Sequence, residues 1–505
     1  MKLNKLFLMA AMGLGLFACS ENELEGNGPE GAQNEGTTYV GLKINFNSSS
    51  TRATGDQPIE GTEDDGDGNE AKVSDVRILV TDADGKSQFN DVVKVDNESS
   101  KYIFQITPGI KKFYAVVNGE ALNLSTELAN WTGNKLLLEK KASELYEYNA
   151  TATDGKGFLM SSVAAVERTI QDNVSEEDVK NGTANNVEIT VERAVAKVTM
   201  KLGESIDFSK QTATLKNLSC QIGNADNLEY NKSGEDDAAK YKTVGTYLMA
   251  YNNNNVRETP YYTYPTTNTE DFWKDFSQAK LLDPTAQTIY TNGQATNTPT
   301  ARFYCLENTH ANSGEKNYLQ GNTTFIRVKA EMIPNSAKTF TYSADSDPQV
   351  TILDKKTMPT ELGTFYVIIA APNQDDQDSY VFASDLAGLY NNLEPGGNET
   401  ETDKKAAAVV KALATYGYNF TEPYIAGCGY YNIWVNDMKD ANNQILNIAP
   451  VFRNDWYKLT ITSLKLPGSP EEGLDPEEPI HPDTNVGVTL TIKDWNMVNH
   501  NVVLQ

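Results

Sequence analysis

The chain contains few of the residues on which catalytic and metal sites depend. Its 505 residues include four cysteines and three histidines. His310, His481 and His500 are not spaced as a metal-binding pair, and no two cysteines form a CxxC motif. The sequence also lacks a phosphate-binding glycine loop, a dinucleotide fingerprint and a zinc motif. We therefore predict no catalytic residue, no metal, no cofactor and no enzyme activity.

The scarcity of cysteine also limits covalent cross-linking. Cys220, Cys305 and Cys428 lie far apart in the sequence, which permits at most one disulfide among them and does not say whether any pair forms. We expect all three to be small, buried core residues.

One acidic stretch imitates the start of a calcium-binding loop. Asp65–Asn69 has the required spacing, but Glu70 stands where such a loop needs glycine, and Val76 stands where it needs glutamate. We interpret this stretch as a solvated acidic loop.

Basic residues are also in deficit. Lysine and arginine number 43, against 69 aspartates and glutamates, which gives a formal net charge of −26. This charge argues against nucleic acid or an anionic lipid surface as a partner. It also makes copies of the chain repel one another, so any polymer must be held by specific burial of side chains.

The apolar leader is too short to cross a membrane as a helix. Leu6–Ala18 follows the basic start Met1–Lys5 and ends at Cys19. This pattern predicts a lipoprotein signal peptide over residues 1–18, cut before Cys19, whose thiol then receives a lipid. An ordinary secretory signal with an incidental cysteine is the alternative. The polar segment Ser20–Gly36 suits a flexible tether.

The rest of the composition favours β structure. Tyrosine, threonine and valine are abundant, and Asn-Gly and Asp-Gly pairs punctuate the chain as turns. Strands are expected at 73–80, 101–106, 112–117, 157–160 and 187–191 in a first domain (53–193), and at 212–222, 301–305, 323–332, 364–369, 429–435 and 455–464 in a second (194–466). One helix is predicted, with Thr402 as N-cap, Ala406–Tyr416 as its body and Gly417 as its stop.

Two short segments at opposite ends of the chain have the same pattern. Apolar residues alternate with small or polar ones in both, and a glycine follows the first apolar residue of each. The paired positions are Val40, Leu42, Ile44 and Phe46, and Val486, Val488, Leu490 and Ile492. Such alternation predicts a strand with one buried face. The duplication suggests strand exchange between subunits, although chance similarity of two amphipathic strands is the alternative.

The residues beside each copy support the exchange hypothesis. Arg52, followed by Ala53, lies among small polar residues just after the first copy, where a loop is accessible to proteases. A cut there would release residues 19–52, which carry both the lipid and the first strand. Residues 467–483 hold five prolines and six acidic residues. We expect them to form an extended spacer ahead of the donor segment 484–505.

Several segments, taken in order, resemble the shaft subunit of the short (minor) fimbriae of Porphyromonas and related Bacteroidales, the type V fimbrillins. They are Met1–Lys5, Val191–Ala196, Leu306–His310, Gly321–Thr323, Tyr430–Trp434, Pro450–Asn454 and Asp494–Trp495. The resemblance implies two transthyretin-like β-sandwich domains and a lipidated precursor at the outer membrane. It also implies cleavage by an arginine-specific protease, then polymerisation by donor-strand exchange with copies of itself and with anchor and tip subunits.

By this resemblance Cys19 is the lipid site, Arg52 the cleavage site, and Val486–Ile492 part of the donor segment. The expected location is the fimbrium on the cell surface, and the expected role is adhesion to host or bacterial surface receptors. Two other functions remain open. One is a surface glycan-binding lipoprotein, suggested by aromatic residues such as Tyr261–Tyr264, and the other is a tip or anchor subunit. The sequence does not identify the receptor, the partner subunits or the filament length.

Overall fold

The computed structural model describes most of the chain outside its leader. The described residues are 36–45, 64–65, 70, 72–93, 95–96, 102–133, 135–148, 155–204, 206, 211–230, 241–243, 245–249, 285–292, 294–295, 300–309, 318–345, 348–437, 448–471, 474, 478–483, 486–496 and 503–504. Cys19, Phe46, Arg52, Ala53 and Tyr261–Tyr264 lie outside this set.

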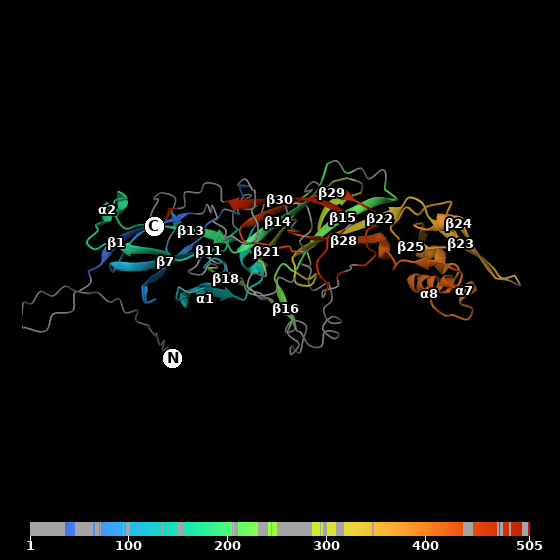
Figure 1. Cartoon of the computed structure of the whole chain (residues 1–505), viewed down its shortest axis with the longest axis horizontal. Helices are drawn as coiled ribbons and strands as arrows, with labels where there is room; N and C mark the ends of the chain where they lie inside the picture. Colours follow the sequence, from blue (N-terminus) through green and yellow to red (C-terminus); the bar gives the residue numbers. More distant parts are fainter. Residues whose placement is uncertain are drawn as a thin grey trace, which may run out of the picture.

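The molecule is elongated, and its strands gather in three successive groups along the long axis (Figure 1). Each group has its own cluster of buried hydrophobic side chains. The first cluster includes Val195 and the second includes Ala196, so the change from one to the next occurs within a single strand.

The first group is an eight-stranded sheet that contains the N-terminal strand copy. Seven strands follow the order β4-β3-β7-β11-β13-β1-β6, and β12 pairs with β7. The strands are β4 (Ser87–Val93), β3 (Val76–Asp82), β7 (Gly109–Val117), β11 (Met160–Ser162), β13 (Asn186–Arg193), β1 (Thr38–Asn45), β6 (Tyr102–Ile106) and β12 (Val166–Ile170).

The second group is a pair of five-stranded sheets that share the second cluster. One has the order β2 (Asp64–Asp65), β30 (Val486–Asn496), β29 (Asp455–Leu464), β14 (Val195–Leu202) and β21 (Thr300–Leu306). The other has the order β20 (Gln294–Ala295), β19 (Gln287–Thr291), β15 (Ala213–Gly223), β22 (Phe325–Pro334) and β28 (Cys428–Trp434). The C-terminal strand copy, β30, therefore belongs to a sheet of its own chain.

The third group lies at the far end of the molecule from β1 (Figure 1). Its sheet has the order β24 (Gln349–Asp354), β23 (Lys338–Ser343), β26 (Tyr380–Phe382), β25 (Phe365–Ala370) and β27 (Asn419–Phe420). Three helices accompany it: α6 (Ala383–Ala387), α7 (Tyr390–Leu393) and α8 (Thr402–Ala414). The sequence assigned these residues to the second domain without indicating a separate core.

The predicted helix is confirmed as α8. It buries Ala406, Val409 and Leu413, which share one face at helical spacing. Its N-cap is Glu401, one residue before the predicted Thr402. Gly417 adopts a φ of +89°, a left-handed conformation that ends the helix region without steric cost.

Short elements complete the described chain. The small strands are β5 (Val95–Asp96), β8 (Leu136–Leu138), β9 (Tyr146–Glu147), β10 (Gly157–Phe158), β16 (Leu228–Tyr230), β17 (Tyr241–Thr243), β18 (Thr246–Leu248) and β31 (Val503–Leu504). The remaining turns of helix are α1 (Ser125–Ala129), α2 (Glu176–Lys180), η2 (Ala142–Glu144), η4 (Gln374–Asp376) and η5 (Ile425–Gly427).

The predicted all-β class is confirmed, and each predicted strand has a counterpart in the structure. The long apolar segment from Val187 to Met200 forms two strands, β13 and β14, with Ala194 between them. That break is where the chain passes from the sheet of the first group to the pair of sheets of the second group. The description of the sandwiches as two transthyretin-like domains stays a prediction.

The described part of the proline-rich segment 467–483 differs from the expected extended spacer. Leu474 and Ile480 are buried, and Ser469 and Pro479 form bridges to Tyr430 and Leu319. The segment thus packs along β28. It does not hold β30 away from the two sheets of the second group. Leucine and isoleucine placed between the prolines supply the apolar contacts that a charged spacer would lack.

Candidate strand-exchange site

Strand β1 is an interior strand of the first sheet. It pairs in parallel with β13, from Gly41 opposite Asn186 to Asn45 opposite Thr190. On its other edge it pairs antiparallel with β6, from Thr38 opposite Ile106 to Leu42 opposite Tyr102. A strand with neighbours on both edges cannot leave without opening a gap between them.

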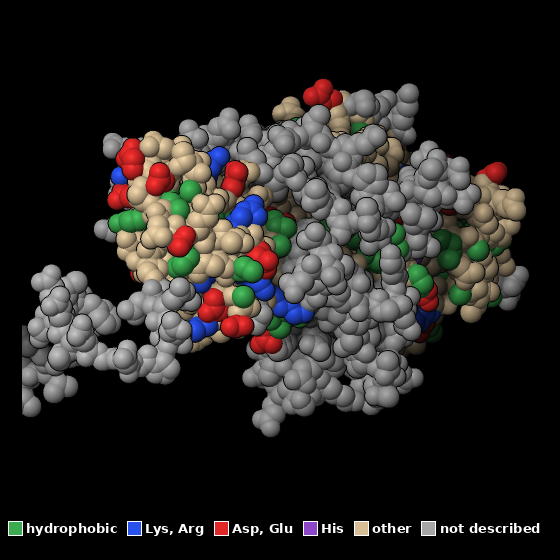
Figure 2. Space-filling model, turned by 60° about the vertical axis from the view of Figure 1, so that its left-hand side comes forward, with side chains coloured by type: hydrophobic (Ala, Val, Ile, Leu, Met, Phe, Trp, Pro, Cys, Tyr) green, Lys and Arg blue, Asp and Glu red, His purple; other side chains and the backbone are tan. Residues whose placement is uncertain are grey.

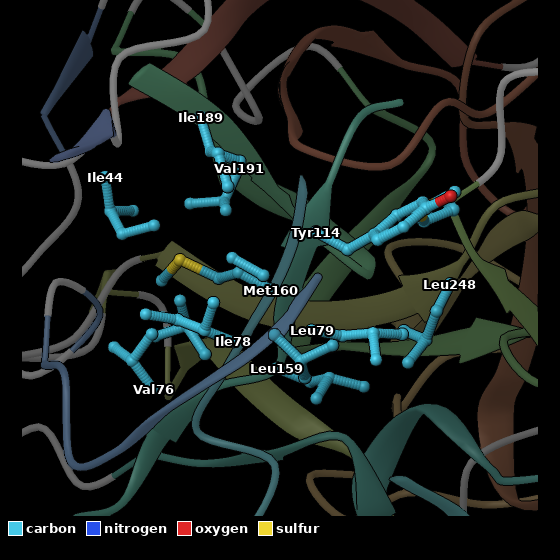
Figure 3. Close-up of a cluster of buried hydrophobic side chains, with 14 of the residues drawn as sticks. Ile44, Val76, Ile78, Leu79, Tyr114, Leu159, Met160, Ile189, Val191 and Leu248 are labelled. Carbon is cyan, nitrogen blue, oxygen red and sulfur yellow. The ribbon is translucent and has the colours of Figure 1, made fainter. Parts of the chain in front are cut away.

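The aliphatic side chains of β1 are buried between β13 and β6. Val40 and Leu42 are 0% exposed and Ile44 is 6% exposed. Figure 3 shows Ile44 with Met160 and Ile189 among the side chains of the first cluster. Burying each such aliphatic side chain stabilises the fold by roughly 1.5–3 kcal/mol. We define this position between β13 and β6 as the β1 seat.

Hydrogen bonds beyond the sheet ladder also hold β1. The Tyr39 amide donates to the carbonyl of Val174 at 3.2 Å, and the Asn185 side chain donates to the carbonyl of Tyr39 at 2.9 Å. The Val174 amide donates to the Thr38 hydroxyl at 3.0 Å. Loss of β1 would leave these buried groups and the facing edges of β6 and β13 without partners, so an empty seat favours a replacement strand.

The surface around the β1 end carries no broad apolar patch on the described face seen in Figure 2. Acidic and basic side chains are interspersed there, and hydrophobic side chains form small separate groups. With β1 in place, the described residues of this face therefore expose hydrophobic side chains only in small separate groups.

Strand β30 shows the alternation that the sequence predicts. Val486, Val488 and Leu490 are half-buried against the second cluster, whereas Thr489 and Thr491 are exposed. The face that these aliphatic residues cover belongs to their own chain, because β30 pairs antiparallel with β29 from Val486 opposite Leu464 to Asp494 opposite Asp455. The side chain of Ile492 lies outside the described residues.

The inner face of β30 is incompletely covered. A groove of about 460 Å³ lies beside it, with Val488 and Leu490 on one wall and Ile433 and Val435, from β28 and just after it, on the other. Within the described chain, the outer edge of β30 pairs with β2 only at Trp495 and Asn496. Among the described residues, β30 is therefore less deeply buried than β1 and is paired along less of its outer edge.

The C-terminal end of β30 is held in a different way, by a buried polar cluster. The Glu70 carboxylate accepts hydrogen bonds from the Lys197 ammonium at 2.8 Å, the Tyr304 hydroxyl at 2.6 Å and the Trp495 indole N–H at 3.0 Å. The side chains of Glu70 and Lys197 are 0% exposed. We call these four residues the Glu70 cluster.

Arg193 joins the Glu70 cluster to the strand break at Ala194. Its guanidinium carbon lies 4.1 Å from the centroid of the Trp495 ring, and it donates to the backbone carbonyl of Trp495. Burial lowers the pKa of the Arg193 guanidinium to about 10, while the charge of Glu70 opposes that shift. Arg193 therefore keeps its charge at neutral pH. Burial, together with the neighbouring carboxylate of Glu70, raises the pKa of the Tyr304 hydroxyl, which stays a donor.

A second buried ion pair, Arg453 with Glu307, accompanies the pair of Lys197 with Glu70. Arg453 contacts Glu307 at 2.9 Å and Glu192 at 3.8 Å, and it donates to the Thr246 hydroxyl at 2.8 Å. The next residue, Asn454, accepts from the backbone N–H of Arg193 at 3.2 Å through its side chain. Removing one partner of such a buried pair typically costs about 3–5 kcal/mol. We call the region between the first and second clusters, where these buried ion pairs lie, the joint.

The position of Glu70 corrects one prediction from the sequence. The acidic stretch was expected to be solvated, yet Glu70 is fully buried at the joint between the first and second clusters. The reason is that three donors converge on its carboxylate and compensate for the loss of water. Sequence reasoning missed this residue because its partners lie between 127 and 425 positions away.

The cysteines lie where the sequence places them. Cys220, Cys305 and Cys428 are free and buried. Burial raises the pKa of the Cys220 thiol to about 12, which makes it unreactive at neutral pH. Within the described ranges, no three His, Cys, Asp or Glu side chains are grouped to hold a metal ion, and no helix is long and apolar enough to cross a membrane.

Comparison with known proteins matches these observations to a family. Residues 422–501, which include β28, β29 and β30, match the model of the C-terminal part of fimbrillin, the type IV major fimbrial subunit protein. The chain is also 24% identical to the minor fimbrium subunit Mfa1 of Porphyromonas gingivalis, over 94% of this chain and 90% of that protein. The chain is a relative of the fimbrillins.

Solved structures of similar proteins cover most of this fimbrillin relative. A Parabacteroides distasonis protein described as a cell adhesion protein aligns with 91% of the chain and 98% of its own, at 15% identity and a TM-score of 0.40. The tip fimbrial protein Mfa3 of P. gingivalis, solved with a C-terminal truncation, aligns with 91% of the chain and 100% of its own, at 12% identity and a TM-score of 0.35.

Proposed function

We propose that this fimbrillin relative is a subunit of a cell-surface fimbria that supports adhesion, and that it forms the shaft of the filament. The role is structural and not catalytic. The subunit polymerises by donor-strand exchange after an arginine-specific protease cuts the lipidated precursor at Arg52. Its partners are copies of itself, the anchor and tip subunits of the fimbria, and receptors on host or bacterial surfaces.

The observation that carries this proposal is the pair of matching strands in unequal environments. In β1, Val40 and Leu42 are fully buried between two neighbouring strands. In β30, Val488 and Leu490 are only half-buried, and among the described residues β30 has one neighbouring strand along most of its length. A strand with the pattern of β30 therefore gains burial and backbone pairing when it moves into an empty β1 seat.

The direction of the incoming strand follows from the register of β1. If the donor takes the orientation of β1, it runs parallel to β13 and antiparallel to β6, with Val488 in the place of Leu42 and Leu490 in the place of Ile44. Completing the burial of each side chain favours this move by up to about 1 kcal/mol. Pairing on both edges adds directionality and excludes water from the ladder.

Cleavage at Arg52 supplies the empty seat. The cut lies seven residues beyond the end of β1 at Asn45, so the released segment takes the whole strand with it. Because the same segment carries Cys19, one cut also separates the subunit from its lipid. Both consequences follow from a single peptide bond, which explains why one proteolytic step can start assembly.

The test uses variants of the full-length chain expressed in cells that assemble the fimbria. Arg52→Ala should leave a lipidated, unpolymerised precursor, whereas the wild-type surface protein should begin at Ala53 by N-terminal sequencing. Arg52→Lys retains the charge but removes the arginine, so it should behave like Arg52→Ala, and Thr51→Ala should assemble normally. Unboiled gel electrophoresis reports the polymer ladder. Normal filaments from Arg52→Ala would show that assembly does not depend on this cut.

A further inference from the structure

We propose that the Glu70 cluster is a latch that holds β30 on its own subunit and thereby limits its release as a donor strand. This inference deepens the proposed function, because a latch on β30 affects assembly only if β30 is exchanged. Glu70 acts here as a positioning residue: it touches Trp495, at the end of β30, and not the aliphatic residues that enter the seat.

The first step of the argument is that Trp495 is held from several sides. Its indole N–H donates to Glu70 at 3.0 Å, and its backbone N–H donates to the carbonyl of Asn454 at 3.0 Å. Tyr304 stacks on the ring at a centroid distance of 5.7 Å, and Phe158 meets it edge-on at 5.0 Å. Trp495 is 0% exposed. Pulling it out would therefore break polar and aromatic contacts together.

The second step is that the other end of β30 is also fixed. The Trp434 indole N–H donates to the carbonyl of His481 at 2.7 Å, and Ile480 is 1% exposed. A strand anchored at His481 and at Trp495 can bow outward as a loop. While both anchors hold, the two ends of the strand stay on their own subunit, so the strand cannot lie along its whole length between β13 and β6 of another subunit. One anchor must open before exchange.

The third step is that the Trp495 anchor depends on a charge that burial makes sensitive. The Glu70 carboxylate is compensated by Lys197, and Lys197 also lies 3.4 Å from the centroid of the Trp456 ring. In a dry site, loss of one charge of this ion pair would leave the other charge poorly compensated. Glu70 also lies beyond Arg52, so it stays with the subunit after the cut. The latch is thus present in both the precursor and the processed subunit.

The experiment compares two variants that each remove one hydrogen bond to the same carboxylate. Trp495→Phe removes the indole donor from β30 but retains an aromatic ring, whereas Tyr304→Phe removes the hydroxyl donor from β21. Hydrogen exchange of the uncut full-length chain is followed by mass spectrometry. Trp495→Phe should raise the exchange rate of the β30 amides between Val486 and Asp494 by about tenfold, the factor expected for loss of one charge-assisted hydrogen bond. Tyr304→Phe should change these amides less than twofold.

Glu70→Gln provides a second variant with the same readout. It retains a side-chain oxygen as acceptor but removes the charge that pairs with Lys197. The exchange rate of the β30 amides should again rise above its wild-type value, and by more than the rates of the β29 and β14 amides. If β30 keeps wild-type protection in folded Trp495→Phe and Glu70→Gln, the latch does not exist. An equal rise in exchange across all strands would identify the cluster as general support and would also overturn the proposal.

The assembly readout separates this inference from the proposed function. After cleavage, Trp495→Phe should polymerise faster than wild type and Tyr304→Phe at the wild-type rate. If β30 exchanges faster in the monomer but polymerisation is unchanged, the cluster holds β30 without limiting its release, and the regulatory part of the inference fails. If filaments form without any β30 exchange, the proposed function fails while the monomer measurement still stands.

Discussion

Single residues of β1 contribute very unequally to the stability of the uncut chain. Leu42 is fully buried in the first cluster, whereas its neighbour Lys43 projects outward and pairs with Glu188 at 3.4 Å, with more than half of each side chain exposed. An exposed ion pair of this kind contributes about 0–1 kcal/mol. The alternation therefore separates residues that hold the strand in its seat from residues that face water.

Substitution at these neighbours should show the difference in the uncut chain. Leu42→Ala should lower the free energy of unfolding of the first sheet by about 2–5 kcal/mol, because it removes core volume. Lys43→Ala, the matched control, should lower it by less than about 1 kcal/mol. Urea denaturation of the unprocessed protein measures both. Similar losses at the two positions would mean that Leu42 is not a core residue of the precursor.

The strand β30 has to satisfy two environments, its own sheet and the proposed seat. Both require the aliphatic residues to face inward and the threonines outward, since the side-chain period of a strand is two residues. In the structure Leu490 is half-buried and Thr491 exposed, as that period demands. The same alternation therefore suits both its own sheet and the proposed seat.

Aspartate placed at the two neighbouring positions tests this element. Leu490→Asp should block filament formation, because it would bury an unpaired carboxylate in the seat at a cost of several kcal/mol. Thr491→Asp should be tolerated, since its side chain faces solvent. Because Leu490 also packs on its own sheet, circular dichroism of each monomer must accompany the filament assay. Equal loss of filaments from two folded variants would rule out an inserted strand with this register.

The whole molecule is held together by chain segments that are distant in sequence. Glu70 from the N-terminal side, the break at Ala194 and Trp495 from β30 meet at the joint between the first and second clusters. The segment 467–483 contributes by packing on β28. The C-terminal strand is therefore part of the architecture of the subunit and not an independent arm.

Deletion of Thr484–Gln505 tests this integration. It removes the partner of β29 along nine paired positions and takes Trp495 from the joint, so the thermal midpoint should fall by more than about 5 °C. Deletion of Met497–Gln505 retains β30 and should have a much smaller effect. Differential scanning calorimetry measures both. An unchanged midpoint after the longer deletion would instead agree with the independent tail that the proline-rich sequence suggests.

The sequence by itself determined the local features of this protein. Alternating and continuous apolar runs predicted the strands, and the capping and stop signals predicted α8 to within a residue at its start, because these patterns depend on neighbours close in the chain. The resemblance of the two strand copies was likewise visible in their residues. The all-β class and the relation to the fimbrillins followed from such local patterns taken together.

Only the tertiary structure decided which distant segments meet. Glu70 looked like one more acid in a solvated loop, and residues 467–483 looked like a free spacer. Each was corrected by partners far away in the sequence, Lys197 and Trp495 for the first and β28 for the second. Burial of a charge depends on which donors converge on it in space, and no period or spacing within the chain records that convergence. For the same reason, only the structure could place β30 on its own sheet and Trp495 in the joint.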